Sequence, residues 1–252
     1  MEFKDKTIIV TGAGQGIGLE VCRQLIAAGG AVVLNDIEER LTREAVAALS
    51  ETGPGLCIGY HGNAADAEVI DGLINAAIRM NGHVDAVMSN AGITLFGDFF
   101  SYTREDFRTV SGTNLESAFF LTQAAAKQMR EQGTGGSILL MSSVTAHQAH
   151  HSLAAYAMTK AATEMLARNL VLDLSPFGIR INAIAPGATL TERTVQDSNY
   201  NKVWSDLTPL GHPASVSDVA SVAMFLLSDR SRHVTGQTLV VDGGWTAVSP
   251  QP

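Results

Sequence analysis

The chain has 252 residues, of which 46% are apolar, and its 17 basic and 25 acidic side chains give a formal net charge of −8. The basic residues are dispersed, which argues against a nucleic-acid-binding protein because nucleic acids are bound by clustered basic side chains. No apolar run approaches the roughly 18 residues of a membrane span, and no signal peptide is evident.

Short β-branched runs alternate along the chain with longer segments of helical periodicity. In chain order, the sequence predicts strand 7–11, helix 17–28, strand 31–36, helix 39–51, strand 56–62, helix 67–80, strand 84–89, a long helical region 103–132, strand 137–141, helix 153–174, strand 180–185, helix 216–228 and strand 238–241. Seven apolar strands separated mostly by helices predict an α/β fold, a doubly wound parallel sheet with helices on both faces.

No linker or charge block marks a boundary, so residues 1–252 are expected to form a single domain. Residues 187–213 lack a clear period and contain Trp204, which is typical of a substrate lid. Cys22 and Cys57 fall in a predicted helix and a predicted strand, and both are expected to be small buried apolar residues. They match no zinc motif, and a cytoplasmic location is expected.

A glycine-rich segment follows the first predicted strand, where doubly wound sheets bind ligands. The spacing is Gly12, Gly16 and Gly18, with Gln15 and Ile17 between them; the pattern G-x-G-x-x-G does not fit, because Ile17 is sixth from Gly12. Glycines at a strand-to-helix turn let backbone N–H groups approach a pyrophosphate. A tight turn alone is the alternative, but a carboxylate at the end of the second predicted strand favours a dinucleotide site.

That carboxylate is Asp36. A carboxylate in this place hydrogen-bonds the adenosine ribose hydroxyls of NAD and repels the 2′-phosphate of NADP. Asn35, rather than a basic residue, precedes Asp36, and no arginine occurs in the glycine-rich segment. Arg40 lies nearby and is the one residue that argues for NADP. The sequence therefore favours NAD as the cofactor.

Tyr156 and Lys160 are four residues apart, and Ser143 lies thirteen residues before the tyrosine. Positions i and i+4 of a helix share a face, so a phenol and an ammonium can point into one cleft. A positive charge near a phenol stabilises the phenolate, so the pair can transfer protons, and Ser143 could hydrogen-bond the reacting oxygen. The alternative is an ordinary contact on a helix surface.

Several motifs, distributed over nearly the whole chain, together resemble those of the short-chain dehydrogenase/reductase family. They are Thr11-Gly12-x-x-x-Gly16-Ile17-Gly18, Asn90-Ala91-Gly92, Asn114, Ser143, Tyr156-x-x-x-Lys160, Pro186-Gly187, Thr235-Gly236-Gln237 and Val241-Asp242-Gly243-Gly244. The resemblance implies a single Rossmann-like domain that binds a nicotinamide cofactor and acts on a CH–OH group.

The resemblance also implies a role for each residue of a catalytic set. Tyr156 would be the general acid and base, and Lys160 would assist it and bind the nicotinamide ribose. Ser143 would orient the substrate oxygen. Asn114 would hold a water that links the lysine to solvent, and a helix-kink or capping role is an alternative that can coexist with this one. The reaction requires no metal.

Further cofactor contacts are implied at the ends of several strands. Beyond the glycine-rich segment and Asp36, they are Asn63, Ala64, Asn90, Ala91, Gly92, Tyr156, Lys160, Pro186, Gly187, Thr189 and Thr191. Asn90 could instead stabilise a strand end, and Thr191, expected to bind the carboxamide, could instead cap a helix. Asn63 replaces the aspartate that is usual in the family, and Ser89 replaces a common asparagine; neither change should prevent binding.

Three segments are expected to contact the substrate: the loop after Gly92, the loop between Ser143 and Tyr156, and the lid. The expected substrate residues are Thr94, Ser143, Thr145, His147, Tyr156 and Trp204. The middle loop also carries His150 and His151, and its polar side chains would suit a hydroxyl-rich substrate such as a sugar or polyol. Surface loops also collect polar residues without function, so substrate contact by the histidines stays open. No carboxylate or cysteine accompanies them, and a metal site is not expected.

The preferred function is NAD-dependent hydride transfer between nicotinamide and a secondary alcohol or ketone, with a sugar or polyol as substrate. The alternatives are a 3-oxoacyl (carrier protein) reductase, which needs a basic entrance, and a steroid or other hydrophobic-alcohol dehydrogenase. A catalytically inactive NAD-binding regulator is a different class, against which the intact catalytic set argues. In this family, helices corresponding to residues 103–132 and 153–174 pack between subunits, which implies a homotetramer or else a dimer.

Overall fold

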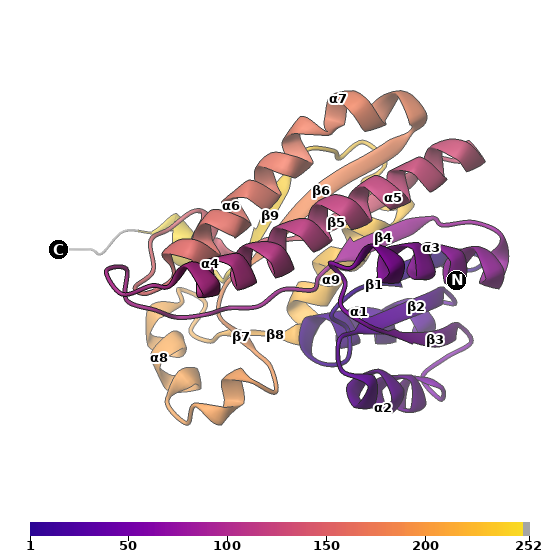
Figure 1. Cartoon of the computed structure of the whole chain (residues 1–252). Coiled ribbons are helices and arrows are strands. Elements are labelled where there is room, and N and C mark those ends of the chain that lie inside the picture. Colours follow the sequence, from indigo (N-terminus) through magenta and orange to yellow (C-terminus); the bar gives the residue numbers. More distant parts are fainter. Residues whose placement is uncertain (249–252) are drawn as a thin grey trace.

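In the computed structural model, which describes residues 1–248, one seven-stranded parallel sheet forms the centre of the molecule (Figure 1). The strand order is β3-β2-β1-β4-β5-β6-β9, so the direction of winding reverses between β1 and β4. The strands are β1 (Thr7–Val10), β2 (Ala31–Asp36), β3 (Leu56–His61), β4 (Ala86–Ser89), β5 (Gly136–Met141), β6 (Ile179–Pro186) and β9 (Thr238–Val241). This arrangement confirms the predicted doubly wound, Rossmann-like fold.

Helices cover both faces of the sheet, as predicted (Figure 1). The helices that pack on one face are α1 (Gly16–Ala27), α2 (Glu39–Leu49) and α9 (Val216–Leu227). Those that pack on the other face are α3 (Ala67–Asn81), α5 (Ser117–Gln132), α6 (Ala154–Asn169) and α7 (Val171–Leu174).

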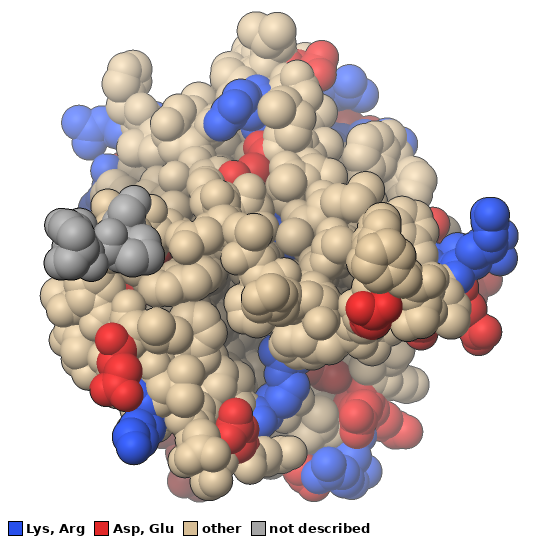
Figure 2. Space-filling view, turned by 90° about the vertical axis from the view of Figure 1, so that its left-hand side faces the viewer, with Lys and Arg blue, Asp and Glu red and all other residues tan. Residues whose placement is uncertain are grey.

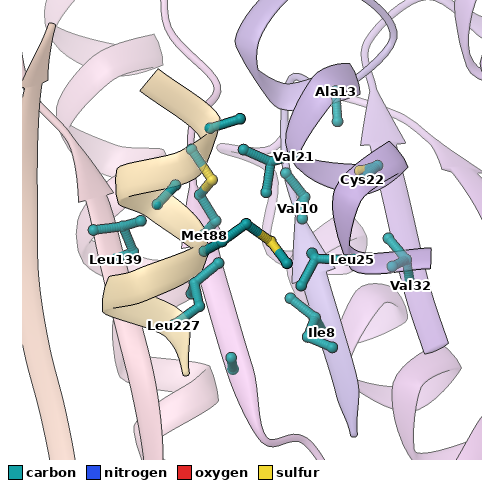
Figure 3. Packing of buried hydrophobic residues seen from close by; sticks show 14 of the residues in the cluster. Ile8, Val10, Ala13, Val21, Cys22, Leu25, Val32, Met88, Leu139 and Leu227 are labelled. Atoms are coloured by element: carbon teal, nitrogen blue, oxygen red, sulfur yellow. The ribbon is translucent and has the colours of Figure 1, made fainter. Parts of the chain in front are cut away.

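The core is divided by the sheet, because successive residues of a strand point to opposite faces. Ile8 and Val10 of β1 belong to the buried cluster beneath α1 and α9, whereas Ile9 belongs to the cluster on the other face. Figure 3 shows the first of these layers, in which Leu25 of α1 and Leu227 of α9 point toward the central strands. This packing fixes the carboxyl ends of the strands, after which the predicted site residues lie.

The β3 edge departs from the expectation that both faces of the sheet are covered. Leu56 and Ile58 of β3 are 62% and 37% exposed. β3 has a neighbouring strand on one side only, and its side chains therefore find fewer packing partners. Cys22 is buried, as predicted, but Cys57 of β3 is only partly buried, so the prediction of a buried Cys57 was wrong.

The predicted helical region 103–132 is continuous but not uniform. It consists of α4 (Arg104–Ser111), a π-helical turn over Gly112–Glu116, and α5. Thr103 caps α4, since its side chain accepts a hydrogen bond from the backbone N–H of Asp106. The π-helical turn contains Asn114, one of the predicted site residues. Likewise, the predicted helix 153–174 is divided into α6 and α7.

Residues 187–213, in which no element was predicted, contain β7 (Thr189–Leu190) and α8 (Tyr200–Leu207). β7 pairs in parallel with β8 (Ala214–Ser215), outside the main sheet. α8 has only eight residues, too few for a hydrophobic period to be recognised. Within residues 1–248, none of the helices combines the length and the hydrophobicity needed to cross a membrane.

Candidate active site

A cavity of about 450 Å³ lies beside the residues that follow β1, β2, β3 and β4. The predicted residues that line it are Gly12, Gln15, Gly16, Ile17, Asp36, Asn63, Ala64, Asn90, Ala91, Gly92, Thr94, Tyr156, Lys160 and Thr191. One cavity therefore brings the glycine-rich segment and Asp36 together with the proposed proton-transfer pair. The predicted residues that do not line it are Gly18, Asn114, Ser143, Thr145, His147, Pro186, Gly187, Thr189 and Trp204.

The glycine-rich segment is packed closely against the end of β4. Gly12 has a φ of +59°, and a Cβ added there would lie 2.7 Å from the Cα of Ala91. Gly18 lies behind the segment, where an added Cβ would be 2.7 Å from Nδ2 of Asn90. Asn90 Nδ2 donates to the carbonyl oxygens of Thr11 and Gly12 at 2.9 and 2.7 Å. Asn90 thus holds the segment in place, in addition to lining the cavity.

The N-terminus of α1 opens onto the same cavity. Gln15, the residue before α1, makes no side-chain hydrogen bond to the first helical turn. The first N–H groups of a helix have no partner within the helix, and here no side chain of the capping residue satisfies them. Such a terminus is suited to a phosphate group.

Asp36 lies between the glycine-rich segment and α2 and is 8% exposed. Its Oδ2 accepts from the N–H of Gly14 at 2.9 Å, and its Oδ1 accepts from the N–H of Glu38 at 3.1 Å. A Cβ added to Gly14 would lie 2.8 Å from Oδ2, so the carboxylate can approach only a glycine there. Arg40 does not line the cavity; its guanidinium is exposed and pairs with Glu44 at 2.7 Å.

The proposed proton-transfer pair lies on α6 and faces the cavity. Lys160 is 4% exposed, and its Nζ donates to the carbonyl oxygen of Met141 at 2.8 Å. The same Nζ lies 5.5 Å from the centre of the Tyr156 ring. An ammonium has three N–H donors, so two remain for a ligand in the cavity.

Asn114 is 2% exposed and connects three parts of the site. Its Oδ1 accepts from the N–H of Ile93 at 2.8 Å, and its Nδ2 donates to the carbonyl oxygen of Ile93 and to Oγ1 of Thr159, both at 3.0 Å. A Cβ added to Gly92 would lie 3.1 Å from Asn114 Oδ1 and 3.3 Å from Lys160 Nζ. The π-helical turn therefore fixes the segment after Gly92 against α6.

Ser143 follows β5 and is 9% exposed. Its Oγ accepts from the N–H of Thr145 at 3.2 Å, while within residues 1–248 the hydroxyl hydrogen has no acceptor. Thr145 Oγ1 is buried and makes no hydrogen bond in the same part of the chain. The Ser143 hydroxyl is therefore able to donate to another molecule, whereas Thr145 Oγ1 is enclosed by protein atoms.

The segment after Gly187 reaches the cavity next to the start of α1, since a Cβ added to Gly16 would lie 3.7 Å from Cγ2 of Thr191 and from Oε2 of Glu192. Among its predicted residues, Thr191 lines the cavity and also interacts with Thr194, whose N–H it accepts at 3.3 Å. Thr189 is buried, and its hydroxyl donates to the carbonyl oxygen of Gly187 at 3.0 Å. Pro186 is the last residue of β6, Gly187 follows it, and neither lines the cavity.

The histidines of the loop before Tyr156 have different surroundings. Nε2 of His147 lies 2.9 Å from Oε1 of Glu164 on α6, so this nitrogen has a partner within the chain. His150 lies between Phe96 and Trp204, with ring centres 6.3 and 6.5 Å away. His151 is exposed.

Trp204 of α8 is the centre of an aromatic cluster. Its ring centre lies 6.1 Å from that of Tyr200 and 5.4 Å from that of Trp245. The cluster joins the loop after Gly92, the loop before Tyr156, α8 and the turn after β9. The three segments expected to contact the substrate are therefore adjacent in space.

Sequence reasoning missed several residues of the site. Gly14 was set aside because the pattern G-x-G-x-x-G did not fit. Gly14 supports Asp36 without lining the cavity; the lining residues that were not predicted include Ile37, Glu38, Ile93, Thr113, Met141, Glu192 and Arg193. Most of them are next to a predicted residue in the sequence. Including the sequence neighbours of each motif would therefore have found them.

A dinucleotide fits these residues. The unsatisfied N–H groups at α1 suit its phosphates, Asp36 suits ribose hydroxyls, and the Lys160 ammonium has donors to spare.

Comparisons with known proteins agree with this site. A family model described as enoyl-(acyl carrier protein) reductase matches residues 12–246. L-rhamnose 1-dehydrogenase (NAD(P)(+)) of Azotobacter vinelandii is 37% identical over 95% of this chain and 96% of its own length. The 3α-hydroxysteroid dehydrogenase of Mediterraneibacter gnavus is 35% identical over 96% of this chain and 98% of its own length.

The fold is also that of a solved relative. The structure of a short-chain type dehydrogenase/reductase from Mycobacterium ulcerans superposes with a TM-score of 0.93 and 30% sequence identity, covering 98% of this chain and 92% of that one. Sequence and fold thus confirm the resemblance carried by the motifs: this chain belongs to the short-chain dehydrogenase/reductase family of oxidoreductases, which bind a nicotinamide cofactor and act on CH–OH groups.

Proposed function

We propose that this protein is an NAD-dependent dehydrogenase that transfers a hydride between nicotinamide and a secondary alcohol or ketone, with a sugar or polyol as substrate. The observation that carries the proposal is that Asp36, Tyr156 and Lys160 all line one cavity. A dinucleotide extending from the carboxylate to the phenol would place its reactive ring beside a group that can transfer a proton.

The preference for NAD is supported by the charges around Asp36. Glu38 also lines the cavity, and Arg40, the one basic residue that argued for NADP, is paired with Glu44. A 2′-phosphate beside two carboxylates would be repelled.

The nicotinamide, when bound, supplies the redox step by exchanging a hydride at its C4 atom. The chain supplies proton transfer and orientation. Tyr156 Oη takes the proton of the alcohol or returns it to the ketone, and the Lys160 ammonium stabilises the phenolate form. Ser143 Oγ accepts a hydrogen bond from the N–H of Thr145, and its own hydrogen remains free to bind the substrate oxygen. Asn114 and Lys160 both lie close to Gly92, and Asn114 is proposed to hold the water that connects the lysine to solvent.

A hydroxyl-rich substrate is supported by the free donors near the reacting oxygen. Ser143, whose hydroxyl hydrogen has no acceptor, and the cavity-lining Thr94 can each bind a substrate hydroxyl. L-rhamnose, the substrate in the name of one relative, is of this class. The second candidate is a hydrophobic alcohol such as a steroid, because the ring of Trp204 offers an apolar surface next to the same loops.

A carrier-protein substrate is less well supported. Figure 2 shows the end of the molecule that carries α8, where uncharged surface predominates and acidic and basic side chains are interspersed. An acidic carrier protein would be attracted by clustered basic side chains. The net charge of −8 also opposes association with an acidic partner.

The homotetramer and the cytoplasmic location are further parts of the proposal. Phe119 and Phe120 of α5 and Met165 of α6 are exposed, and apolar side chains on adjacent helices are suited to burial between subunits. Both cysteines are free thiols, which agrees with a reducing compartment.

The test is the rate of cofactor reduction with a panel of sugars, polyols, simple secondary alcohols and hydroxysteroids, each with NAD and NADP. The proposal expects NADH formation with at least one sugar or polyol, at a higher kcat/KM than with NADP. Turnover confined to hydroxysteroids would favour the second candidate. Tight NAD binding without turnover of any member would favour an inactive regulator.

A further inference from the structure

Glu164 is a carboxylate inside the structure that the proposed mechanism does not use. It lies on α6, one helical turn after Lys160, and its side chain is 12% exposed. Its Oε1 accepts a hydrogen bond from Ser142 Oγ at 2.6 Å and lies 2.9 Å from Nε2 of His147. A carboxylate with so little access to water depends on such donors.

The two donors lie on either side of Ser143. Ser142 precedes it at the end of β5, and His147 follows it after the short 3-10 turn Val144–Ala146. The hydrogen bond of Ser143 itself is local, to the N–H of Thr145. Its position relative to α6 therefore depends on contacts made by the flanking residues.

These contacts differ on the two sides of Ser143. Before it, the chain is joined to α6 by three hydrogen bonds, one from Lys160 Nζ to Met141 O and two from Ser142 Oγ, to Lys160 O and to Glu164 Oε1. After it, one side-chain hydrogen bond in the described structure joins the 3-10 turn and the residues that follow it to α6. This is the bond between His147 and Glu164. This bond holds the chain that follows Ser143, where the loop before Tyr156 begins, against α6.

We propose that His147 and Glu164 form a positioning pair that holds the Ser143 hydroxyl in register with Tyr156 on the same helix. The role rests on the proposed function, and it makes His147 act through Ser143 rather than by touching the substrate. Proton transfer and hydride transfer both depend on the placement of the reacting oxygen, and a displacement of about 1 Å can cost roughly 100-fold in rate. The pair would therefore govern turnover more than binding.

The experiment compares His147→Ala, His147→Gln, Glu164→Gln and the double variant His147→Ala/Glu164→Gln, each with the alcohol that the wild type oxidises best. Gln148→Ala is the matched control, because Gln148 is the exposed neighbour of His147. We expect kcat of His147→Ala to fall about tenfold, with KM for the alcohol and Kd for NAD changed less than about twofold. His147→Gln keeps an N–H donor of similar reach and should recover most of kcat.

The double variant measures the coupling. If the pair acts as one unit, the double variant loses no more kcat than the worse single variant. If the fold losses in kcat of the two single variants multiply in the double variant, the positioning role is overturned. An increase in KM that differs among alcohols would also overturn it and would indicate direct contact of His147 with the substrate. An unchanged kcat in His147→Ala would also overturn it. A wild type without turnover would instead overturn the proposed function, and this role with it.

Discussion

Oδ2 of Asp36 accepts a hydrogen bond from the backbone N–H of Gly14 at 2.9 Å, so the carboxylate expected to select the cofactor is held by the glycine-rich segment itself. The same bond orients Asp36 toward the cavity that it lines. Cofactor selection and the shape of the glycine-rich segment are therefore linked.

Asp36→Ala should weaken NAD binding and partly admit NADP. The variant loses a charged acceptor for the ribose hydroxyls, which corresponds to roughly a 10- to 100-fold increase in Kd for NAD. The repulsion of a 2′-phosphate is lost as well. Titration calorimetry with both cofactors measures the change, and Arg40→Ala is the control because that side chain is exposed and paired with Glu44. Unchanged discrimination in Asp36→Ala would show that other residues select the cofactor.

Gly14→Ala should have a similar effect by a different route. The added Cβ would lie 2.8 Å from Oδ2 of Asp36 and 2.8 Å from Cβ of Leu41, so one of these groups must move. We expect weaker NAD binding and a loss of about 1–3 kcal/mol in the free energy of unfolding, as is usual for overpacking. Denaturant unfolding and calorimetry on the same preparation measure both. If Gly14→Ala binds NAD with the affinity of the wild type, NAD binding does not depend on the observed position of Asp36.

Tyr156→Phe should abolish turnover and leave NAD binding nearly intact. The substitution removes only the hydroxyl that exchanges the proton, and general acid–base catalysis contributes roughly 100- to 10,000-fold. Steady-state kinetics and NAD titration distinguish the two effects. Tyr60→Phe, which removes a phenolic hydroxyl on β3, should be fully active. If Tyr156→Phe is equally active, another group transfers the proton.

Asp242 should stabilise the turn that carries Trp245 in a pH-dependent manner. Burial raises the pKa of its carboxyl, but hydrogen bonds from Thr246 and from the N–H of Gly244 outweigh that effect and hold the pKa below its ordinary value. A lowered pKa in the folded state means that the stabilisation is present above about pH 4 and is lost as the pH falls through the folded pKa.

Asp242→Ala tests this by unfolding experiments and tryptophan fluorescence, since Trp245 lies against Trp204, the other tryptophan. At neutral pH the variant should be less stable by at most about 1 kcal/mol, because solvent screens the carboxylate, and its emission should differ from that of the wild type. Both differences should disappear in acid. A difference in stability that stays the same as the pH falls from neutral through the folded pKa would contradict the assignment to ionisation.

Most of the fold was predictable, because the strands are apolar runs bounded by glycines and turns. The bounds of β2 (Ala31–Asp36) and β9 (Thr238–Val241) agree with the predicted ones. α8 was not predicted because eight residues give no recognisable period. The π-helical turn around Asn114 leaves the apolar pattern of the long helical region intact, so periodicity alone could not reveal it.

The candidate site was predictable where motif residues occupy strand ends, since parallel strands bring these ends to one edge. Asp36 at the end of β2 and Asn90 after β4 could be assigned to one site on this basis, whereas Lys160 was assigned from its helical spacing to Tyr156 and from the family resemblance. Contacts that depend on the path of a loop could not be predicted from the sequence. The pairing of His147 with Glu164 depends on how the chain after Ser143 turns back onto α6, and no sequence period encodes that turn.

In the proposed reaction, one cavity holds NAD with its nicotinamide beside Tyr156. A crystal structure of the NAD complex tests this placement. We expect the adenosine ribose at Asp36, the phosphates at the N-terminus of α1, and the nicotinamide ring next to Tyr156 Oη. A dinucleotide bound elsewhere, or with its nicotinamide remote from Tyr156, would contradict the proposed reaction.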